Sequence, residues 1–405
     1  MIFEGKGKGK TSNAYLFTKA VTSMITIQGI HADAIIYSNQ LDPSAAKQIK
    51  ELADTELADN IRIMPDYHAG AGCVIGTTML VGSKVCPNLV GVDINCGITA
   101  VKLDEKITSK SDFAAFDDFL RTTIPTGFAV HKKTITDREE TSHWEHEISK
   151  LSLPVDRSEQ SRAVRALGTL GGGNHFIELG TDKANNQWLS VHSGSRGIGN
   201  KTAAWHQDLA ISKNRGDVPK ALSFLTGKDL DNYYKDLGIM TAYADRNREL
   251  MLITMIQGFF ARKLGKVIVT DHNNITDGIL HKGAVIATKG KTIMVPMNMA
   301  DGILICKGLG NPDWNNCAPH GAGRLYSRSQ ARKILSMAEF DQKMKQVYSS
   351  SIKKSTLDES PMAYKPTDEI SELIAPTAEI VDRIIPLYNF KDLGQLNPAR
   401  RQRRA

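Results

Sequence analysis

Cysteine pairs are missing from this 405-residue chain. Its five cysteines are odd in number and widely spaced, and no two stand in a CxxC arrangement: Cys73, Cys86, Cys96, Cys306 and Cys317. This pattern argues against a disulfide framework and excludes a four-thiolate zinc site. We therefore expect most of these cysteines to be small buried hydrophobic residues, with Cys96 as the exception because of its neighbours.

Long apolar runs are also missing. No stretch approaches the roughly 18 to 20 apolar residues that span a bilayer. Residues 1–15 lack the apolar segment and small-residue cleavage site of a secretory signal. With 41% hydrophobic and 23% charged residues, the composition is that of a globular protein with a substantial core. We expect a cytoplasmic enzyme that makes no contact with a membrane.

Positive charge is concentrated at the two ends of the chain. The net charge is +7, but residues 399–405 carry four arginines and no acid, so the body without them is only +3. Such a tail suits a polyanion such as RNA, because neutralised phosphates release counterions. A solvated tail without a partner is an equally favoured alternative. A second basic cluster, Lys6, Lys8 and Lys10, alternates with glycines and lacks the preceding strand that a Walker motif requires.

Hydrophobic periodicity and cap signals predict a mixture of helices and strands. Asp42 and Pro43 open an amphipathic helix, and further helices are predicted over 112–120, 239–263, 329–347 and 367–384. Strands are predicted over 61–64, 77–81 and 89–94, and strands with hairpins over 266–310. Because helices and strands do not alternate regularly, the order favours an α+β fold.

Five compact motifs combine glycine with residues that bind metals or phosphates. They are MPDYHAG at 64–70, GVDINCG at 91–97, GGGNHF at 171–176, VHSGSRG at 191–197 and PHGAGR at 319–324, with TDHNN at 270–274 as a weaker sixth. Each lies where a predicted strand meets a tight turn. Glycine there permits positive φ and a close approach of the backbone to a ligand.

The motifs offer a mixed set of metal ligands. A spacing of three allows one turn to bring Asp93 and Cys96 to the same ion, and His175 and His192 each stand beside a predicted strand. Carboxylate, thiolate and imidazole together suit a borderline divalent ion, zinc first and manganese second. The alternative is an Asx-turn at Asp93 with a buried Cys96. His272 is the least certain, since residues 271–273 also fit an ordinary turn.

Three arginines within or beside the motifs could bind phosphate. Arg196, Arg324 and Arg328 carry planar guanidinium groups that suit bidentate phosphate contacts. The alternative for each is a surface salt bridge. Their place in the glycine motifs favours phosphate. The remaining histidines lack such settings, and we expect no role in the site for His31, His131, His143, His146, His206 and His281.

Taken together, the motifs resemble the RtcB family of tRNA-splicing and RNA-repair ligases. The resemblance runs from about residue 61 to about residue 391, with the motifs in the family's order and a further match at PMAYK, 361–365. It implies an α+β fold in which β-sheets and flanking helices surround a deep metal-containing cleft. Residues 1–398 would then form a single catalytic domain, and 399–405 a disordered basic tail.

The resemblance also implies roles for individual residues. The ligands of two manganese ions would be Asp93, Cys96, His175, His192 and His272, with the cysteine bridging the ions. His320 would attack the α-phosphorus of GTP. The guanylate would be held by Asn174, Glu178, Asn298, His320, Gly321, Ala322, Gly323, Tyr364 and Lys391. The phosphates and the RNA ends would meet Asp66, Arg196, Lys282, Arg324 and Arg328.

Two departures from the family pattern affect the nucleotide site. Where the family often has Pro-Gly-Ser-Met, this chain reads PMNM at 296–299. Asn298 can still donate a hydrogen bond in place of serine, but Met297 lacks the conformational freedom of glycine. Lys391 is the loosest match, because the family usually ends soon after that lysine and this chain continues for fourteen residues.

In the reaction that the resemblance implies, an RNA 2′,3′-cyclic phosphate is opened to a 3′-phosphate. GMP is transferred to that phosphate, and a 5′-hydroxyl RNA end then displaces GMP and seals the strand. An archease-like activator is a candidate partner. Two alternatives belong to other classes. A metal-dependent phosphoesterase would act on RNA ends without sealing them, but it would not need His320. An inactive RNA-binding repair factor would not need intact Cys96, His175, His192 and His320.

Overall fold

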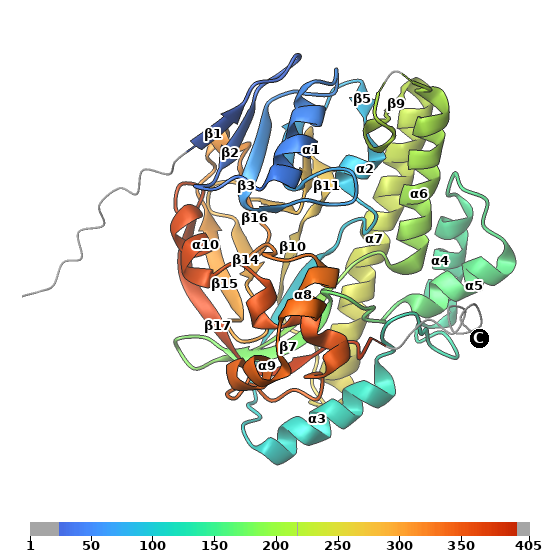
Figure 1. The fold of residues 1–405 in the computed structure, drawn as a ribbon. Coiled ribbons are helices and arrows are strands. Elements are labelled where there is room, and N and C mark those ends of the chain that lie inside the picture. The colour runs from blue at the N-terminus through green and yellow to red at the C-terminus, as the bar shows by residue number, and fades with distance from the viewer. Residues whose placement is uncertain (1–23, 217, 395–405) are drawn as a thin grey trace, which may run out of the picture.

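The fold is seen in a computed structural model that describes residues 24–216 and 218–394. Both basic clusters, the lysines at 6, 8 and 10 and the tail 399–405, lie outside the described residues. Two large β-sheets occupy the centre, and the long helices α6 (Arg196–Lys213) and α7 (Gly227–Gly258) run along one side of them (Figure 1). Within the described ranges, no helix combines the length and apolar character needed to cross a membrane.

The larger sheet has seven strands, and every neighbouring pair in it is antiparallel. In spatial order they are β10 (Val267–Asp271), β6 (Gly97–Leu103), β8 (Gln187–Ser193), β7 (Phe176–Thr181), β17 (Ala378–Phe390), β15 (Ile303–Gly308) and β14 (Thr292–Pro296). Residues of β6 alternate between two cores. Val101 packs among residues of the surrounding helices, whereas Ala100 packs with Met294 and Ile303. Both faces of this sheet are therefore covered.

The second sheet has six strands: β1 (Met24–Ile27), β2 (Ala34–Tyr37), β3 (Ile61–His68), β4 (Ile75–Leu80), β12 (Ile279–Lys282) and β11 (Asn273–Thr276). Only β2 and β3 are parallel, and α1 (Pro43–Ala53) forms their crossover. The Asp42 side chain caps α1 by accepting a hydrogen bond from Ala45 N at 2.8 Å. Two short pairs complete the strands: β13 (Ala284–Ile286) with β16 (Cys317–Pro319), and β5 (Lys84–Val85) with β9 (Leu225–Thr226).

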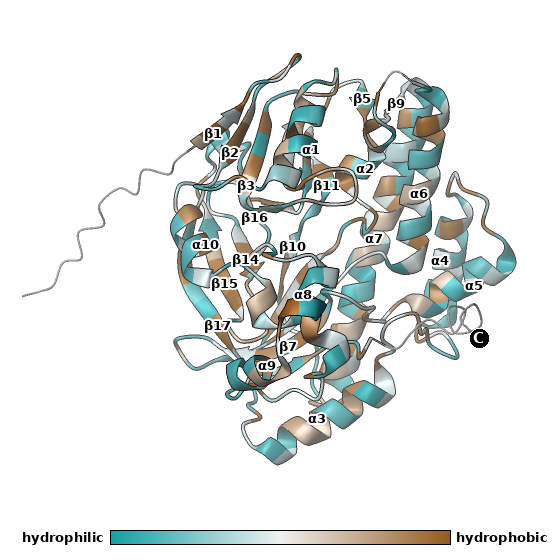
Figure 2. Ribbon diagram, in the orientation of Figure 1, coloured by the Kyte–Doolittle hydropathy of each residue, from teal (hydrophilic) through white to brown (hydrophobic). Residues whose placement is uncertain are grey.

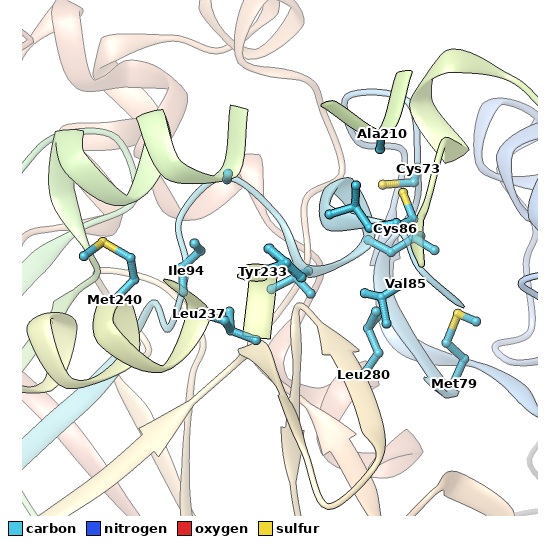
Figure 3. Close-up of a cluster of buried hydrophobic side chains, with 14 of the residues drawn as sticks. Cys73, Met79, Val85, Cys86, Ile94, Ala210, Tyr233, Leu237, Met240 and Leu280 are labelled. Atoms are coloured by element: carbon cyan, nitrogen blue, oxygen red, sulfur yellow. The ribbon is translucent and has the colours of Figure 1, made fainter. Parts of the chain in front are cut away.

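Helices cover the sheets and carry the polar surface. They include α2 (Pro87–Val90), α3 (Lys110–Thr123), α4 (Arg138–Ser149), α5 (Arg157–Ala166), α8 (Arg328–Ile334), α9 (Met337–Lys343) and α10 (Thr367–Leu373), with short 3-10 turns at η1 (Lys220–Leu222), η2 (Pro312–Trp314), η3 (Lys354–Glu359) and η4 (Pro361–Ala363). Figure 2 shows α5 as mainly hydrophilic. Figure 3 shows Tyr233 and Leu237 of α7 in one apolar cluster with Cys86 and Leu280. All five cysteines are buried and unpaired, as expected.

The α+β fold is confirmed, and so are several predicted elements. The helix after Pro43, the helix around 112–120 and the strands near 61–64, 77–81 and 266–310 are all present. The long helix is displaced from its predicted range of 239–263, because it begins at Gly227 and ends at Gly258. The region 329–347 forms two short helices, since Ser336 caps a new helix directly after Leu335.

Two predicted elements are wrong. Residues 89–94 do not form a strand. Pro87 begins the short helix α2, and Gly91, with φ of 107°, ends it. The predicted helix over 367–384 ends at Leu373, and β17 begins at Ala378. Pro376 cannot continue a helix and disfavours helical geometry in the residue before it. The β-branched residues that follow it suit a strand.

Candidate metal and nucleotide site

The topology of the seven-stranded sheet brings the predicted metal ligands to one edge. Cys96 immediately precedes β6, and His192 lies at the end of β8, opposite Ile98. His175 immediately precedes β7, and His272 immediately follows β10. Because β6 and β7 begin where the antiparallel β8 and β10 end, four ligands far apart in sequence converge.

The converging side chains form two triads that share Cys96. Asp93, Cys96 and His175 form one, and Cys96, His192 and His272 form the other; within each triad the ligand atoms lie within 4.8 Å of one another. Cys96 Sγ is 3.4 Å from His175 Nε2 and 3.3 Å from His192 Nε2. A thiolate that bridges two metal ions must belong to both ligand sets, and Cys96 does so.

The histidine orientations fit metal binding. His175 Nδ1 lies 2.9 Å from the carbonyl oxygen of Leu170, and His192 Nδ1 lies 3.3 Å from that of Asn174. A carbonyl oxygen only accepts, so each Nδ1 carries the proton and each Nε2 presents a lone pair. His175 Nε2 is then 2.8 Å from Asp93 Oδ2. Two lone pairs this close repel each other unless a cation lies beside them, so the donor set fits divalent metal.

Burial shapes the charges of these ligands. Burial raises the pKa of the Cys96 thiol well above its usual value, and the Asp93 carboxylate raises it further. Burial lowers the pKa of His192 and of His272 well below the usual range, so both rings are neutral. A thiolate forms in such surroundings only with a cation nearby, as metal binding would provide.

The α7 helix holds the backbone of two motifs that carry predicted metal ligands. Arg248 is fully buried, and its Nη1 donates to the carbonyl oxygens of Asn95 at 2.7 Å and Ser193 at 2.9 Å. One guanidinium therefore joins the turn that presents Cys96 to the strand end that presents His192. A Cβ at Gly97 would lie only 2.5 Å from the carbonyl oxygen of Thr270. Glycine is required there because β10 approaches so closely.

His320 stands beside the second triad, directly after β16. Its ring centroid lies 4.9 Å from that of His272. Asp66 Oδ2 accepts from the backbone N–H groups of His320 and Gly321 at 3.1 and 3.2 Å. The same oxygen lies 2.6 Å from His320 Nδ1, although this contact lacks hydrogen-bond geometry. Asp66 thus fixes one side of the ring.

A cavity of about 370 Å³ lies over both triads, a volume that suits a nucleotide-sized ligand. Most of the predicted site residues line it: Asp93, Cys96, Asn174, Glu178, His192, His272, Lys282, Asn298, His320, Gly321, Ala322, Gly323, Arg324, Arg328, Tyr364 and Lys391. Asp66, His175 and Arg196 do not line it, but Asp66 and His175 contact residues that do. The structure therefore gathers motifs spread over some 300 residues around one cavity.

One wall of the cavity has unpaired acceptors. Glu178 Oε2 accepts from Asn389 Nδ2 at 2.9 Å. Glu178 Oε1 and Asn389 Oδ1 are both buried without a partner among the described residues. Burial raises the pKa of Glu178 to about 8. Buried polar atoms are rarely left unpaired, so this wall fits a ligand with N–H donors, such as the edge of a guanine base.

A second group of cavity residues is organised by the carboxylate of Glu359, which the sequence did not reveal. Glu359 Oε2 accepts from Tyr364 Oη at 2.7 Å and from Lys391 Nζ at 3.2 Å. Its Oε1 contacts Arg328 and also Arg324 Nη1, the latter at 3.4 Å. Burial opposes ionisation, yet Lys391 and the arginines hold the pKa of Glu359 at about 2. One buried charge thus orients four predicted ligand-binding residues.

Three other predicted residues bond within the protein. Lys282 Nζ donates to Asn88 O at 2.6 Å and to Cys73 Sγ at 3.0 Å. Asn298 donates to Asp301 at 2.7 Å and accepts from two backbone N–H groups of its own turn. Arg196 donates to Thr169 Oγ1 and to the Gly127 carbonyl oxygen. Arg196 therefore fastens the loop behind His175.

Among the residues of this region that the sequence did not predict, four have clear roles in its geometry. His68 and Asn389 line the cavity, Glu359 organises its wall, and Arg248 supports the metal-binding turns. His68 belongs to the MPDYHAG motif, and membership of that motif could have identified it from the sequence as a site residue. The pKa of His68 is lowered to about 4, by burial and by His320. Arg248, at a buried position of an otherwise amphipathic helix, was a weaker signal.

Comparison with known proteins is consistent with this geometry. Residues 48–392 match the family described as tRNA-splicing ligase RtcB. RNA-splicing ligase RtcB1 of Escherichia coli strain ATCC 25922 is 29% identical over 80% of this chain and 87% of its own length. RNA-splicing ligase RtcB of Escherichia coli K12 gives the same three values. tRNA-splicing ligase RtcB of Nanoarchaeum equitans is 26% identical over 83% of this chain and 89% of its own length.

Proposed function

This chain belongs to the RtcB family, and we propose that it is an RNA ligase that carries GMP on His320. It would join RNA 3′-phosphate or 2′,3′-cyclic phosphate ends to 5′-hydroxyl ends, in RNA repair or tRNA splicing. The observation that carries this proposal is the position of His320. It lies beside two metal-ligand triads that share Cys96, at a cavity lined by buried carboxylates and by cations.

The first step would load GMP onto the protein. His320 Nε2, on the ring side away from Asp66, attacks the α-phosphorus of GTP; the new N–P bond replaces the bond to the bridging oxygen, and pyrophosphate leaves. Two manganese ions held by Asp93, Cys96, His175, His192 and His272 would neutralise phosphate charge. Zinc suits the same donors, so the choice of manganese depends on the family resemblance. Asp66 would hold the His320 ring during the attack.

The nucleotide would lie within the cavity. The unpaired oxygens of Glu178 and Asn389 would accept the N–H donors of guanine. Lys391, Tyr364 and Asn174 would complete the contacts to the guanylate, with Asn298 and the backbone of Gly321, Ala322 and Gly323 nearby. These acceptors would favour guanine over adenine, because guanine N1 carries a hydrogen that it can donate and adenine N1 does not.

The later steps would use RNA as the second substrate. Water opens a cyclic phosphate, and an oxygen of the resulting 3′-phosphate attacks the GMP phosphorus and displaces His320. The 5′-hydroxyl oxygen of the other RNA end then attacks the activated 3′-phosphate, forming the phosphodiester while GMP departs. Arg324, Arg328 and Lys282 would hold the RNA phosphates beside the cavity. An archease-like activator is a candidate partner.

The experiment that tests this function is incubation with manganese and α-labelled GTP, followed by denaturing electrophoresis. The wild-type protein should acquire a covalent label that is acid-labile and alkali-stable, as a phosphoramidate is. His320→Ala should remove the label and leave folding and manganese binding intact. His143→Ala, at an exposed helical position, is the control and should label normally. A label on the His320→Ala protein would assign the nucleophile to another residue. Hydrolysis of RNA ends without sealing would indicate a phosphoesterase instead.

A further inference from the structure

A loop outside the cavity lining lies against its rim. A Cβ at Gly172 would lie 3.6 Å from Gly127 Cα, and a Cβ at Gly173 would lie 3.2 Å from Arg328 Nη2. Gly127 N donates to the Gly171 carbonyl oxygen at 2.8 Å. The loop at 126–128 is therefore joined to the glycine loop 171–173, which in turn reaches a guanidinium that lines the cavity.

This loop presents an aromatic side chain to solvent. Phe128 is 66% exposed, more than any other phenylalanine, tyrosine or tryptophan among the exposed side chains of the described residues. The loop itself is firmly held. Arg196 Nη2 donates to the Gly127 carbonyl oxygen at 2.8 Å, and Arg162 Nη2 donates to the Phe128 carbonyl oxygen at 2.7 Å. Two guanidinium groups therefore hold the backbone that presents this ring to solvent.

The surroundings of Phe128 are basic. Lys132 and Lys133 follow in the same loop, and Arg157 and Arg162 lie on the neighbouring helix α5; all four side chains are exposed. Arg165 Nη1 donates to the His131 carbonyl oxygen, which adds a further cation to the loop. Glu159 of α5 is engaged by Lys201. Two more acids lie here, because Asp156 caps α5 and Asp392 accepts from Thr126 Oγ1. The five cations of the patch still outnumber its three acids.

We propose that Phe128, with the basic side chains of 132–133 and α5, is a stacking platform for single-stranded RNA next to the cavity. Aromatic rings in positively charged grooves bind single strands because every base offers a π-face and every nucleotide a phosphate. The loop of this platform reaches Arg328 at the cavity through the glycine loop 171–173, so an RNA end bound in the cavity would extend onto it. This proposal extends the proposed RNA-ligase function and rests on it for the conclusion that the bound single strand is RNA.

The test measures binding of a fluorescent single-stranded RNA to the full chain by anisotropy, beside the GMP-labelling assay. Phe128→Ala should weaken RNA binding by about 5- to 150-fold, the range expected for loss of one stacked base. Phe128→Trp should restore it. GMP labelling should be unchanged in both, since the loop holds no guanylate. Tyr234→Ala, which removes a 37% exposed ring from α7, is the matched control and should bind like wild type.

The lysines test the charge component. Changing Lys132 and Lys133 together to alanine should lower the salt slope of RNA binding by about 1.4 units. The same changes at the exposed Lys289 and Lys307 should lower it less. RNA binding by Phe128→Ala equal to that of wild type would overturn the platform. Absence of GMP labelling in the wild-type protein would overturn the ligase function instead, while RNA binding would still judge the platform.

Discussion

Lys391 Nζ lies 3.2 Å from Glu359 Oε2, and both side chains are buried. The lysine immediately follows β17 and also donates to the backbone carbonyl oxygen of Asn174 at 3.1 Å. The contact therefore joins the end of the C-terminal strand, the loop before His175 and the cavity wall of Tyr364. A single carboxylate connects the region where we propose that guanylate binds with the arginines that we propose for the RNA phosphates.

Glu359→Gln should damage both stability and GTP use. The neutral amide would leave Lys391, Arg324 and Arg328 without their shared negative partner, and breaking such a buried pair costs about 3 to 5 kcal/mol. We expect a lower melting temperature and a higher GTP concentration for half-maximal GMP labelling. Glu379→Gln, an exposed position on β17, is the control. An unchanged GTP dependence would reduce Glu359 to a structural role.

Cys96→Ser should lose the metal pair. A neutral hydroxyl replaces the soft anionic sulfur common to both triads, so manganese bound per chain after dialysis should fall below two, and GMP labelling should fall steeply. Cys306→Ser also changes a buried cysteine, in β15 away from both triads, and should retain the metal. Normal manganese content and normal ligation in Cys96→Ser would show that Cys96 does not bridge.

The sequence identified much of the candidate site because its ligand types stand in short glycine motifs. Asp93, Cys96, His175 and His192 were found from local chemistry, while His272 and His320 depended on the family resemblance. What the sequence could not provide was their convergence, which follows from antiparallel strands that begin and end at one sheet edge. Glu359 was missed for the same reason, since its partners lie in other segments.

The fold was less predictable where periodicity conflicts with turn chemistry. Residues 378–390 continue an apolar pattern that also fits a helix, but Pro376 stops the helix and the strand then pairs with β7 and β15. Residues 89–94 suggest a strand because they are apolar, yet the tight turn at Gly91 is needed to present Asp93. In both places, a proline or a glycine outweighs the apolar pattern.

Glu178 should make the stability of the nucleotide-free protein depend on pH. Its pKa is raised to about 8 in the folded state, against about 4.3 in an unfolded chain. Because the pKa is higher in the folded state, the protonated Glu178 contributes its full stabilisation at pH values below the unfolded pKa. This stabilisation is lost as the pH rises through about 8. At about 1.4 kcal/mol per pKa unit, the free energy of unfolding should fall by up to about 4 kcal/mol between about pH 5 and pH 8.

Glu178→Gln should remove most of that fall, as measured by urea unfolding at a series of pH values. The amide cannot ionise, so the variant should gain stability relative to wild type as the pH rises. Glu372→Gln, at an exposed position of α10, should follow the wild-type curve. Parallel curves for wild type and Glu178→Gln would mean that Glu178 is ionised throughout, with its unpaired oxygen satisfied by water.

Deleting residues 399–405 tests the basic tail, whose four arginines the family resemblance does not explain. The described chain ends at Gly394, two residues after Asp392, whose Oδ1 accepts from Thr126 Oγ1 at 2.9 Å. The arginines begin six residues beyond Gly394, a contour length of at most about 21 Å. The last described residues therefore lie beside the loop that carries Phe128.

If the four arginines contact RNA phosphates, the deletion should lower the salt slope of RNA binding by about 3 to 4 units. Affinity should fall similarly for unrelated RNA sequences, because phosphate contacts carry no base information. Replacing the four arginines with glutamine should reproduce the effect without shortening the chain. GMP labelling of His320 should be unchanged. An unchanged salt slope would show that the tail is a solvated end. Loss of GMP labelling would instead mean that the C-terminus packs over the nucleotide site, because loss of RNA-phosphate contacts alone would not impair the loading of GMP.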